Sequence, residues 1–198
     1  MSYNNDIFQI FPSRVMVSEA QEFDWRDDFV QWVEDYQQQH EGAEVSNVGG
    51  YQSKGNFYLK LEDDSFQPFK DKIWNHIEYA VKCYAEEIEL YNILAGGASL
   101  RLMNLWFNAN PPGAFNHVHV HPGSLLSGVL WIKIPDDSGD LFLRDPTEMN
   151  SYCLGSACVT FPAEEGTLLL FPSHIPHNVG VNKSEDTRIS VSFNLDFG

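Results

Sequence analysis

The first 95 residues place apolar side chains three and four positions apart, which is the spacing of a helix with one buried face. One such stripe consists of Trp25, Phe29, Trp32, Val33 and Tyr36. A longer stripe consists of Phe66, Phe69, Ile73, Ile77, Val81, Tyr84, Ile88 and Tyr91. Asp63, Asp64 and Ser65 stand directly before it, where acidic and hydroxyl side chains favour a helix start. The pattern predicts two amphipathic helices.

After residue 95 the period changes to two, which is the spacing of strands. In residues 187–197 the apolar Ile189, Val191, Phe193, Leu195 and Phe197 alternate with Arg188, Ser190, Ser192, Asn194 and Asp196. Five further segments are predicted as strands: 100–108, 128–134, 139–143, 157–161 and 167–171. Residues 46–53 are predicted as a Gly-rich loop or an edge strand. Many short strands separated by turns predict a mainly β fold, an antiparallel barrel or jelly roll, with the N-terminal helices packed outside.

The length predicts one domain over residues 1–198, with a helical support region at 1–95 and a β core at 96–198. Twelve basic against 28 acidic residues give a net charge of −16, which argues against nucleic acid and anionic membranes as partners. The sequence has no apolar run long enough for a membrane span, and no secretion signal. Three cysteines without Cys-x-x-Cys spacing predict free thiols and a cytoplasmic location.

Histidines carry the strongest chemical signal in the chain. His117, His119 and His121 alternate with Val118 and Val120, so on a strand all three imidazoles would project from one face and both valines from the other. Imidazoles two residues apart lie about 7 Å apart at Cβ and can bind one metal ion. A third ligand from another strand has two candidates, His174 and His177, which directly follow the segment 167–171.

Arg188 is the one cation on the polar face of the last predicted strand, two residues from Ser190. A guanidinium beside a hydroxyl can bind the carboxylate of an anionic ligand near a metal. An exposed salt bridge with one of the many acidic residues is the alternative role for Arg188.

The order of these motifs resembles a known superfamily. His119-Val120-His121-Pro122-Gly123, Ser127-Gly128-Val129, Phe171-Pro172-Ser173, His177 and Arg188-x-Ser190 resemble the iron(II)- and 2-oxoglutarate-dependent oxygenases. The branch with a His-x-His-Pro motif, found in marine bacteria and their phages, is the most similar. Residues 46–53 resemble the N-terminal signature of that branch.

This resemblance implies a double-stranded β-helix, a cupin-like jelly roll, that binds Fe(II) and 2-oxoglutarate as co-substrate. It implies His119, His121 and His177 as metal ligands. Arg188 and Ser190 match the pair that binds the distal carboxylate of 2-oxoglutarate, and Asn108 is a weaker contact to the co-substrate. The implied activity is a dioxygenase, in particular a hydroxylase, that couples decarboxylation of 2-oxoglutarate to oxidation of a substrate.

One position departs from the pattern of the superfamily, which binds iron through two histidines and a carboxylate. The carboxylate position holds His121, so the site would carry one more unit of positive charge. His117, Asp140 and Asp145 are the alternative residues that could complete the site. Three histidines also suit Zn(II).

The departure leaves two other functions open. One is a cupin-like protein that binds a metal or a small acid without turnover. The other is a metal-dependent cupin enzyme that does not use 2-oxoglutarate. The expected substrate is a small molecule or a protein of unknown identity, and a homodimer is the oligomeric state that base rates favour.

Overall fold

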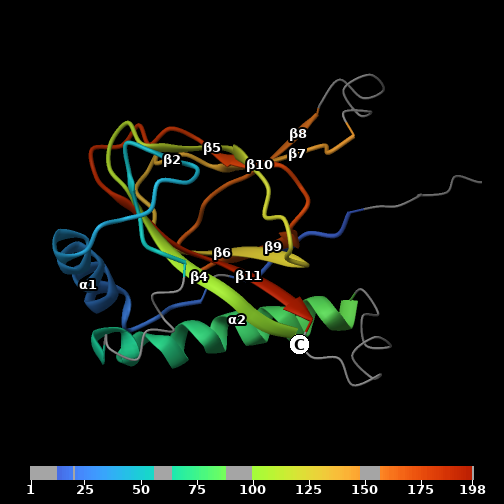
Figure 1. The fold of residues 1–198 in the computed structure, drawn as a ribbon, viewed down its shortest axis with the longest axis horizontal. Helices are drawn as coiled ribbons and strands as arrows, with labels where there is room; N and C mark the ends of the chain where they lie inside the picture. Colours follow the sequence, from blue (N-terminus) through green and yellow to red (C-terminus); the bar gives the residue numbers. More distant parts are fainter. Residues whose placement is uncertain (1–12, 20, 56–63, 88–99, 148–156, 198) are drawn as a thin grey trace, which may run out of the picture.

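Two antiparallel sheets face each other in the computed structural model, and two helices lie under one of them (Figure 1). The described residues are 13–19, 21–55, 64–87, 100–147 and 157–197. The larger sheet has the order β1 (Met16–Val17), β9 (Leu168–Pro172), β6 (Leu126–Lys133), β11 (Arg188–Phe197), β4 (Leu100–Asn110) and β3 (Tyr51–Gln52). The smaller sheet has the order β2 (Asn47–Val48), β5 (Phe115–His119), β10 (His177–Val179), β7 (Leu141–Arg144) and β8 (Cys158–Phe161). The predicted jelly roll with helices outside is confirmed.

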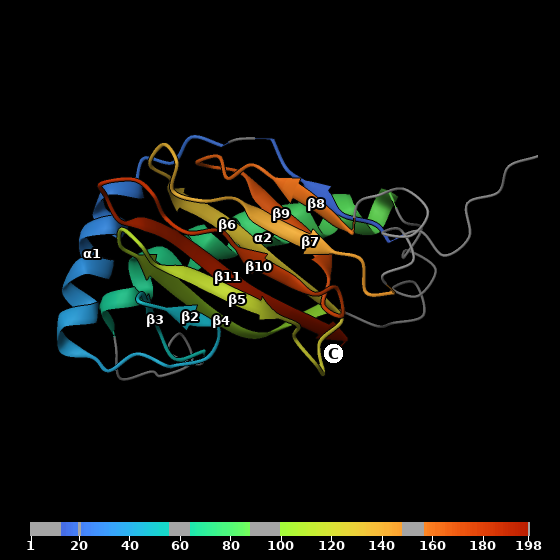
Figure 2. The same cartoon turned by 90° about the horizontal axis from the view of Figure 1, so that it is seen from above.

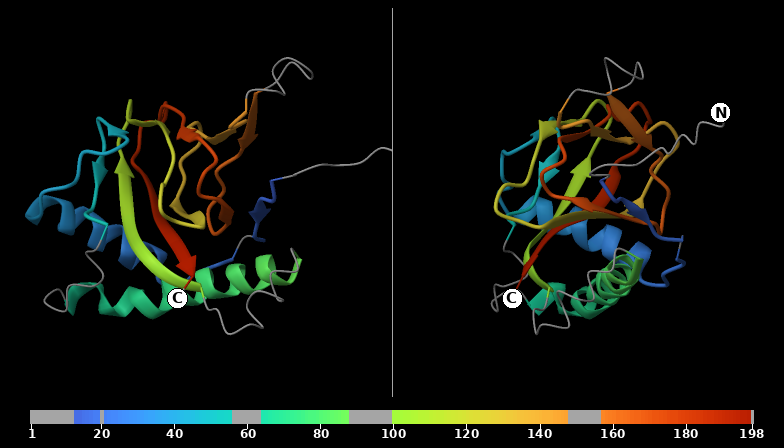
Figure 3. Two further views of the ribbon diagram at one scale, coloured as in Figure 1. Left: turned by 45° about the vertical axis from the view of Figure 1, so that its right-hand side comes forward. Right: turned by 90° about the vertical axis from the view of Figure 1, so that its right-hand side faces the viewer.

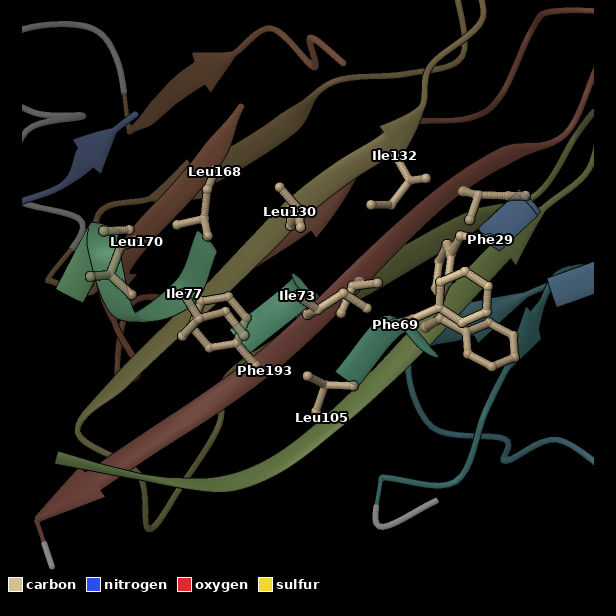
Figure 4. Close-up of a cluster of buried hydrophobic side chains, with 14 of the residues drawn as sticks. Phe29, Phe69, Ile73, Ile77, Leu105, Leu130, Ile132, Leu168, Leu170 and Phe193 are labelled. Carbon is tan, nitrogen blue, oxygen red and sulfur yellow. The ribbon is translucent and has the colours of Figure 1, made fainter. Parts of the chain in front are cut away.

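The helices are α1 (Arg26–Gln39) and α2 (Gln67–Glu87), the latter preceded by a short 3₁₀ turn, η2 (Asp64–Phe66). Both bury the predicted apolar faces against the larger sheet, and Figure 4 shows Phe29, Ile73 and Ile77 among strand side chains. The predicted continuation of the second stripe to Ile88 and Tyr91 lies outside the described residues. No described helix is long and apolar enough to span a membrane.

β11 divides the molecule into two environments. Its apolar positions, among them Val191 and Phe193, pack into the cluster between the larger sheet and the helices. Its polar positions are also buried, with exposed fractions of 3% at Arg188, 7% at Ser190 and 3% at Asn194. Because strand side chains alternate, these polar groups face the space between the two sheets, which Figure 3 shows from its side. The predicted polar face is therefore an interior surface.

The space between the sheets has an apolar half and a polar half. The apolar half is a second cluster, which includes Trp131, Leu141 and Phe171. The polar half holds the hydrogen-bonded Asn110 and Asn116, with Ser46 beside them. Trp131 thus contributes to a core, and the polar half is where a ligand can find hydrogen-bond partners.

Residues 46–53 bridge the two sheets at one end. The segment forms β2, which pairs with β5, and then β3, which pairs with β4 (Figure 2). Gly49 between them has φ of 69°, a conformation that glycine adopts at little cost. Together with β1, these short strands place parts of the first 95 residues inside both sheets.

Gly128 lies on β6 where the ring of Phe193 crosses it, and a Cβ at this position would overlap the ring. We predict that Gly128→Ala lowers the free energy of unfolding by roughly 1–3 kcal/mol, the usual cost of overpacking a core, as measured by urea denaturation. Gly55→Ala is the control, because the nearest atom to its Cβ would be 3.6 Å away. Equal stability of the two variants would contradict the predicted overlap.

Candidate metal centre

Three imidazoles meet at one end of the smaller sheet. His119 ends β5 and lies directly opposite His177, which begins β10. His121 follows two residues later, and its Nε2 is 3.2 Å from Nε2 of His177. One ring nitrogen from each of the three residues lies within 4.8 Å of the other two. The structure therefore brings together the three histidines that the resemblance implies.

Backbone carbonyls fix the orientation of two of these rings. Nδ1 of His119 is 2.7 Å from the carbonyl oxygen of His117, and Nδ1 of His177 is 3.0 Å from that of Ile175. A carbonyl can only accept, so in each ring Nδ1 carries the proton. Nε2 then presents its lone pair to the centre of the cluster, which is the arrangement of metal-binding histidines.

Burial keeps the three imidazoles neutral. Desolvation, together with the nearby His119, lowers the pKa of His177 to about 3 and that of His121 to about 4. Desolvation also lowers the pKa of His119. Neutral imidazole is the form that binds metals, so the cluster is ready to coordinate a cation at neutral pH.

The spacing fits a transition-metal ion. Metal–nitrogen bonds of about 2.1 Å at right angles place two ligand nitrogens roughly 3 Å apart, close to the 3.2 Å between His121 and His177. An all-imidazole set suits Fe(II) and Zn(II) alike. The donor geometry therefore fits the implied metal without selecting one.

The predicted one-face arrangement of His117, His119 and His121 is wrong. In the ladder between β10 and β5, His177 pairs with His119 and Val179 pairs with Asn116. Three residues along β5 are therefore matched by two along β10. This bulge reverses the alternation and turns Asn116 inward. His117 is exposed and packs on Phe115.

The two valines between the histidines lie on the outside of the smaller sheet. Val118 is 51% and Val120 is 41% exposed, because the outer face of this part of the smaller sheet has no layer of helices over it (Figure 1).

The other candidate residues have different places. Asp145 accepts hydrogen bonds from the backbone and hydroxyl of Thr147 in a turn, and Asp140 accepts one from the backbone of Ala163. His174 is exposed. Among the described residues, no carboxylate belongs to the cluster of ring nitrogens.

Arg188 is buried and lines the same cavity as His119 and His121. Its Nη1 donates to the carbonyl oxygens of Ser138 and Gly139, at 2.8 and 3.0 Å, and burial lowers its pKa to about 10. Among the described residues, no carboxylate lies within 4.0 Å of its guanidinium. The alternative of an exposed salt bridge is therefore wrong, and Arg188 remains charged at neutral pH with no anionic partner in contact.

Ser190 and Asn108 line this cavity beside Arg188. The Asn108 amide donates to Ser192, while its Oδ1 is buried without a partner. A flip of the amide would turn its NH₂ toward the cavity, where it could donate to a carboxylate. The volume of the cavity is about 40 Å³, room for roughly two or three waters.

Trp106 and Asn116 also line the cavity, and the sequence interpretation did not select them. Trp106 stands two residues before Asn108 on β4, so the period of two could have identified it. Asn116 could not be found in this way, because the bulge in β5 changes which side chains face inward.

The fold and the cluster define a class: a jelly roll with a histidine metal centre facing a buried arginine. Residues 104–194 match the family model described as "Putative 2OG-Fe(II) oxygenase". This match covers slightly less than half of the chain, and it confirms the resemblance that the motifs carry. Among curated proteins, no sequence matches the chain.

Several solved structures share the fold of this chain. A prolyl-4-hydroxylase from Pseudomonas putida has a TM-score of 0.60 at 16% identity, with 93% of each chain covered. The epimerase SnoN from nogalamycin biosynthesis, solved with Fe³⁺, alpha-ketoglutarate and nogalamycin RO, has a TM-score of 0.65 at 13% identity, covering 92% of this chain and 78% of that chain. A 2OG-Fe(II) oxygenase family oxidoreductase from Burkholderia pseudomallei matches over 50% of this chain and 46% of its own, with a TM-score of 0.43 and 16% identity. The Pseudomonas putida and SnoN structures show the fold of this chain, and the family match together with the histidine cluster supports a 2-oxoglutarate-dependent dioxygenase.

The histidine cluster predicts how the stability of the metal-free protein depends on pH. The pKa of its histidines is near 6.5 in the unfolded chain, and burial lowers all three in the folded protein, to about 3 for His177 and about 4 for His121. Between about pH 3, where folded His177 titrates, and pH 6.5 the unfolded chain therefore binds more protons, so the free energy of unfolding rises with pH in this window and levels off above it. His177→Gln should reduce this rise relative to the wild type, by an amount on the order of a few kcal/mol. Urea denaturation at several pH values measures the free energy of unfolding. If it rises with pH equally in the wild type and in His177→Gln, the prediction is contradicted.

Proposed function

We propose that the protein is an Fe(II)- and 2-oxoglutarate-dependent hydroxylase. The observation that carries the proposal is that His119 and His121 line one cavity with a buried arginine that has no carboxylate in contact, and that His177 completes the cluster of neutral imidazoles. His119, His121 and His177 would hold the metal through Nε2. With Fe(II) and 2-oxoglutarate bound, the chemistry supplied would be hydroxylation of a substrate C–H bond by O₂, in which one oxygen atom enters the substrate and the other enters the succinate that forms as 2-oxoglutarate loses CO₂.

In this proposal Arg188 binds the distal carboxylate of 2-oxoglutarate. Its guanidinium is fixed by the carbonyls of Ser138 and Gly139, so little side-chain freedom remains to be lost on binding. Ser190 offers a hydroxyl, and Asn108, whose Oδ1 is buried without a partner, would offer its NH₂ to the carboxylate after a flip of the amide. The apolar side chains of Trp106 and Leu141 exclude water on the remaining walls.

The all-histidine donor set favours a second candidate, a jelly-roll protein that binds Zn(II) or a small acid without turnover. In both candidates the substrate or ligand is a small molecule or a protein segment. The charge of −16 disfavours nucleic acid. A homodimer and a cytoplasmic location stay predictions.

An anaerobic titration with Fe(II) and then 2-oxoglutarate separates the two candidates. The hydroxylase is expected to develop a visible metal-to-ligand charge-transfer band, which His177→Ala abolishes. Arg188→Ala should raise the 2-oxoglutarate concentration at half-saturation by at least thirtyfold, because losing the charged partner of a buried carboxylate costs roughly 2–5 kcal/mol. Arg101→Ala, on the exposed part of β4, is the control and should titrate as the wild type does. Tightly bound Zn(II) with no band and no succinate would favour the binding protein.

His121 gives a prediction about charge. Replacing its neutral ring with a carboxylate removes one unit of positive charge from the metal site, so His121→Asp should weaken 2-oxoglutarate binding by about tenfold. His121→Asn is the matched control, since it has the same shape as aspartate without the charge. Calorimetric titration of the Fe(II)-loaded variants with 2-oxoglutarate measures the difference. Equal affinities in the two variants would show that this charge does not assist binding.

A further inference from the structure

His121 is anchored differently from the other two histidines of the cluster. His119 and His177 are opposite residues in the ladder between β5 and β10. The ladder ends at His119, and Pro122 has no N–H with which to continue it. The backbone N–H of His121 instead donates to the carbonyl oxygen of Ser173, at 3.1 Å. The position of His121 therefore depends on Ser173.

Ser173 binds the segment 121–127 through all of its polar groups. Its carbonyl accepts from His121, its N–H donates to the carbonyl of Leu125 at 3.1 Å, and its hydroxyl lies 2.8 Å from that of Ser127. Its exposed fraction is 0%. The same turn closes when the N–H of Ile175 donates to Pro172, and the carbonyl of Ile175 orients His177. One buried serine thus connects the backbone of His121 to the turn that orients His177.

The hydroxyl of Ser173 begins a chain of hydrogen bonds whose direction is fixed. The amide oxygen of Asn194 can only accept, so Ser127 donates to it at 2.6 Å. The hydroxyl of Ser173 must then donate to Ser127. At the far end, Nδ2 of Asn194 donates to Oδ1 of Asn104 at 2.8 Å. Such chains polarise each other in a buried environment, and each member restrains the next.

We propose that Ser173, Ser127 and Asn194 are positioning residues for His121, which hold its Nε2 at the metal through this chain. The inference rests on the proposed metal centre and deepens it. The two serines belong to the motifs Ser127-Gly128-Val129 and Phe171-Pro172-Ser173, to which the hydroxylase proposal gives no role. His121 lies beyond the end of β5. The chain of hydrogen bonds gives it the rigidity that strand pairing gives to His119 and His177.

The test is binding of Co(II), as a spectroscopic probe, to the metal-free protein. Ser127→Ala removes the middle of the chain and leaves the hydroxyl of Ser173 and the oxygen of Asn194 unpaired. We expect its Kd for Co(II) to rise 10–100-fold, as is usual when residues that orient a metal ligand are lost. Its visible spectrum should shift toward that of His121→Ala, which defines the centre without the third ring.

Ser53→Ala is the matched control. Ser53 is also 0% exposed, and its hydroxyl accepts one hydrogen bond, from the N–H of Phe107 at 3.0 Å. This variant should melt at a lower temperature than the wild type but keep its Kd and spectrum. A second pair covers the case in which Ser127→Ala does not fold. Asn104 is half-buried at the outer end of the chain, so Asn104→Ala should weaken Co(II) binding, whereas Asn104→Asp keeps an acceptor and should restore it.

If Ser127→Ala keeps the wild-type Kd and spectrum, the inference is overturned and the hydrogen bonds have a purely structural role. If Ser127→Ala does not fold, wild-type values in both Asn104 variants overturn it. A wild-type protein that does not bind Co(II) would overturn it together with the metal centre. If Co(II) binds and the variants respond as expected, but 2-oxoglutarate gives no succinate with Fe(II), only the hydroxylase proposal fails.

Discussion

The site depends on the burial of a charged guanidinium between two sheets. A buried charge is costly unless its surroundings satisfy it, and Arg188 is satisfied by two carbonyls of the turn before β7. The interior that accommodates it is correspondingly polar. The protein can tolerate this because most of its large buried side chains lie on the other side of the larger sheet, under α1 and α2. β11 separates the two environments, because its alternate side chains point into the core on one side and toward the cavity on the other.

The charges of the site follow from the same arrangement. A divalent metal on three neutral imidazoles keeps both of its charges, whereas a carboxylate ligand would neutralise one. With the guanidinium of Arg188 in the same cavity, the metal and the arginine would together carry about three positive units, which the nearby carboxylate of Asp140 offsets in part. A dianion that reaches both the metal and the arginine offsets most of it, while the acidic surface contributes little to a buried site because solvent screens it. The substitution of His121 for a carboxylate therefore favours an anionic ligand more strongly.

Much of this arrangement could be predicted from the sequence because it is periodic. The stripes that contain Phe29 and Ile73 gave the two helices, and the alternation from Arg188 to Phe197 gave the last strand and the side on which Arg188 lies. The resemblance of the motifs, carried over residue by residue, also identified His119, His121 and His177, whose rings the fold brings together. These features depend on local pattern or on motif order, which the linear chain contains.

The bulge between β5 and β10 could not be predicted, because an extra residue in a ladder changes no hydrophobic period on its own. It keeps His117 out of the histidine cluster and turns Asn116 toward the cavity. The pair His117 and His119 therefore differs from the pair His119 and His121, although both have His-x-His spacing. The role of Ser173 was hidden for a related reason. Its contacts with His121 and Ser127 join segments about fifty residues apart in the chain, and a serine next to a proline in sequence predicts only a turn. Local pattern thus determines which side chains are available to the site, and irregular pairing determines which of them meet.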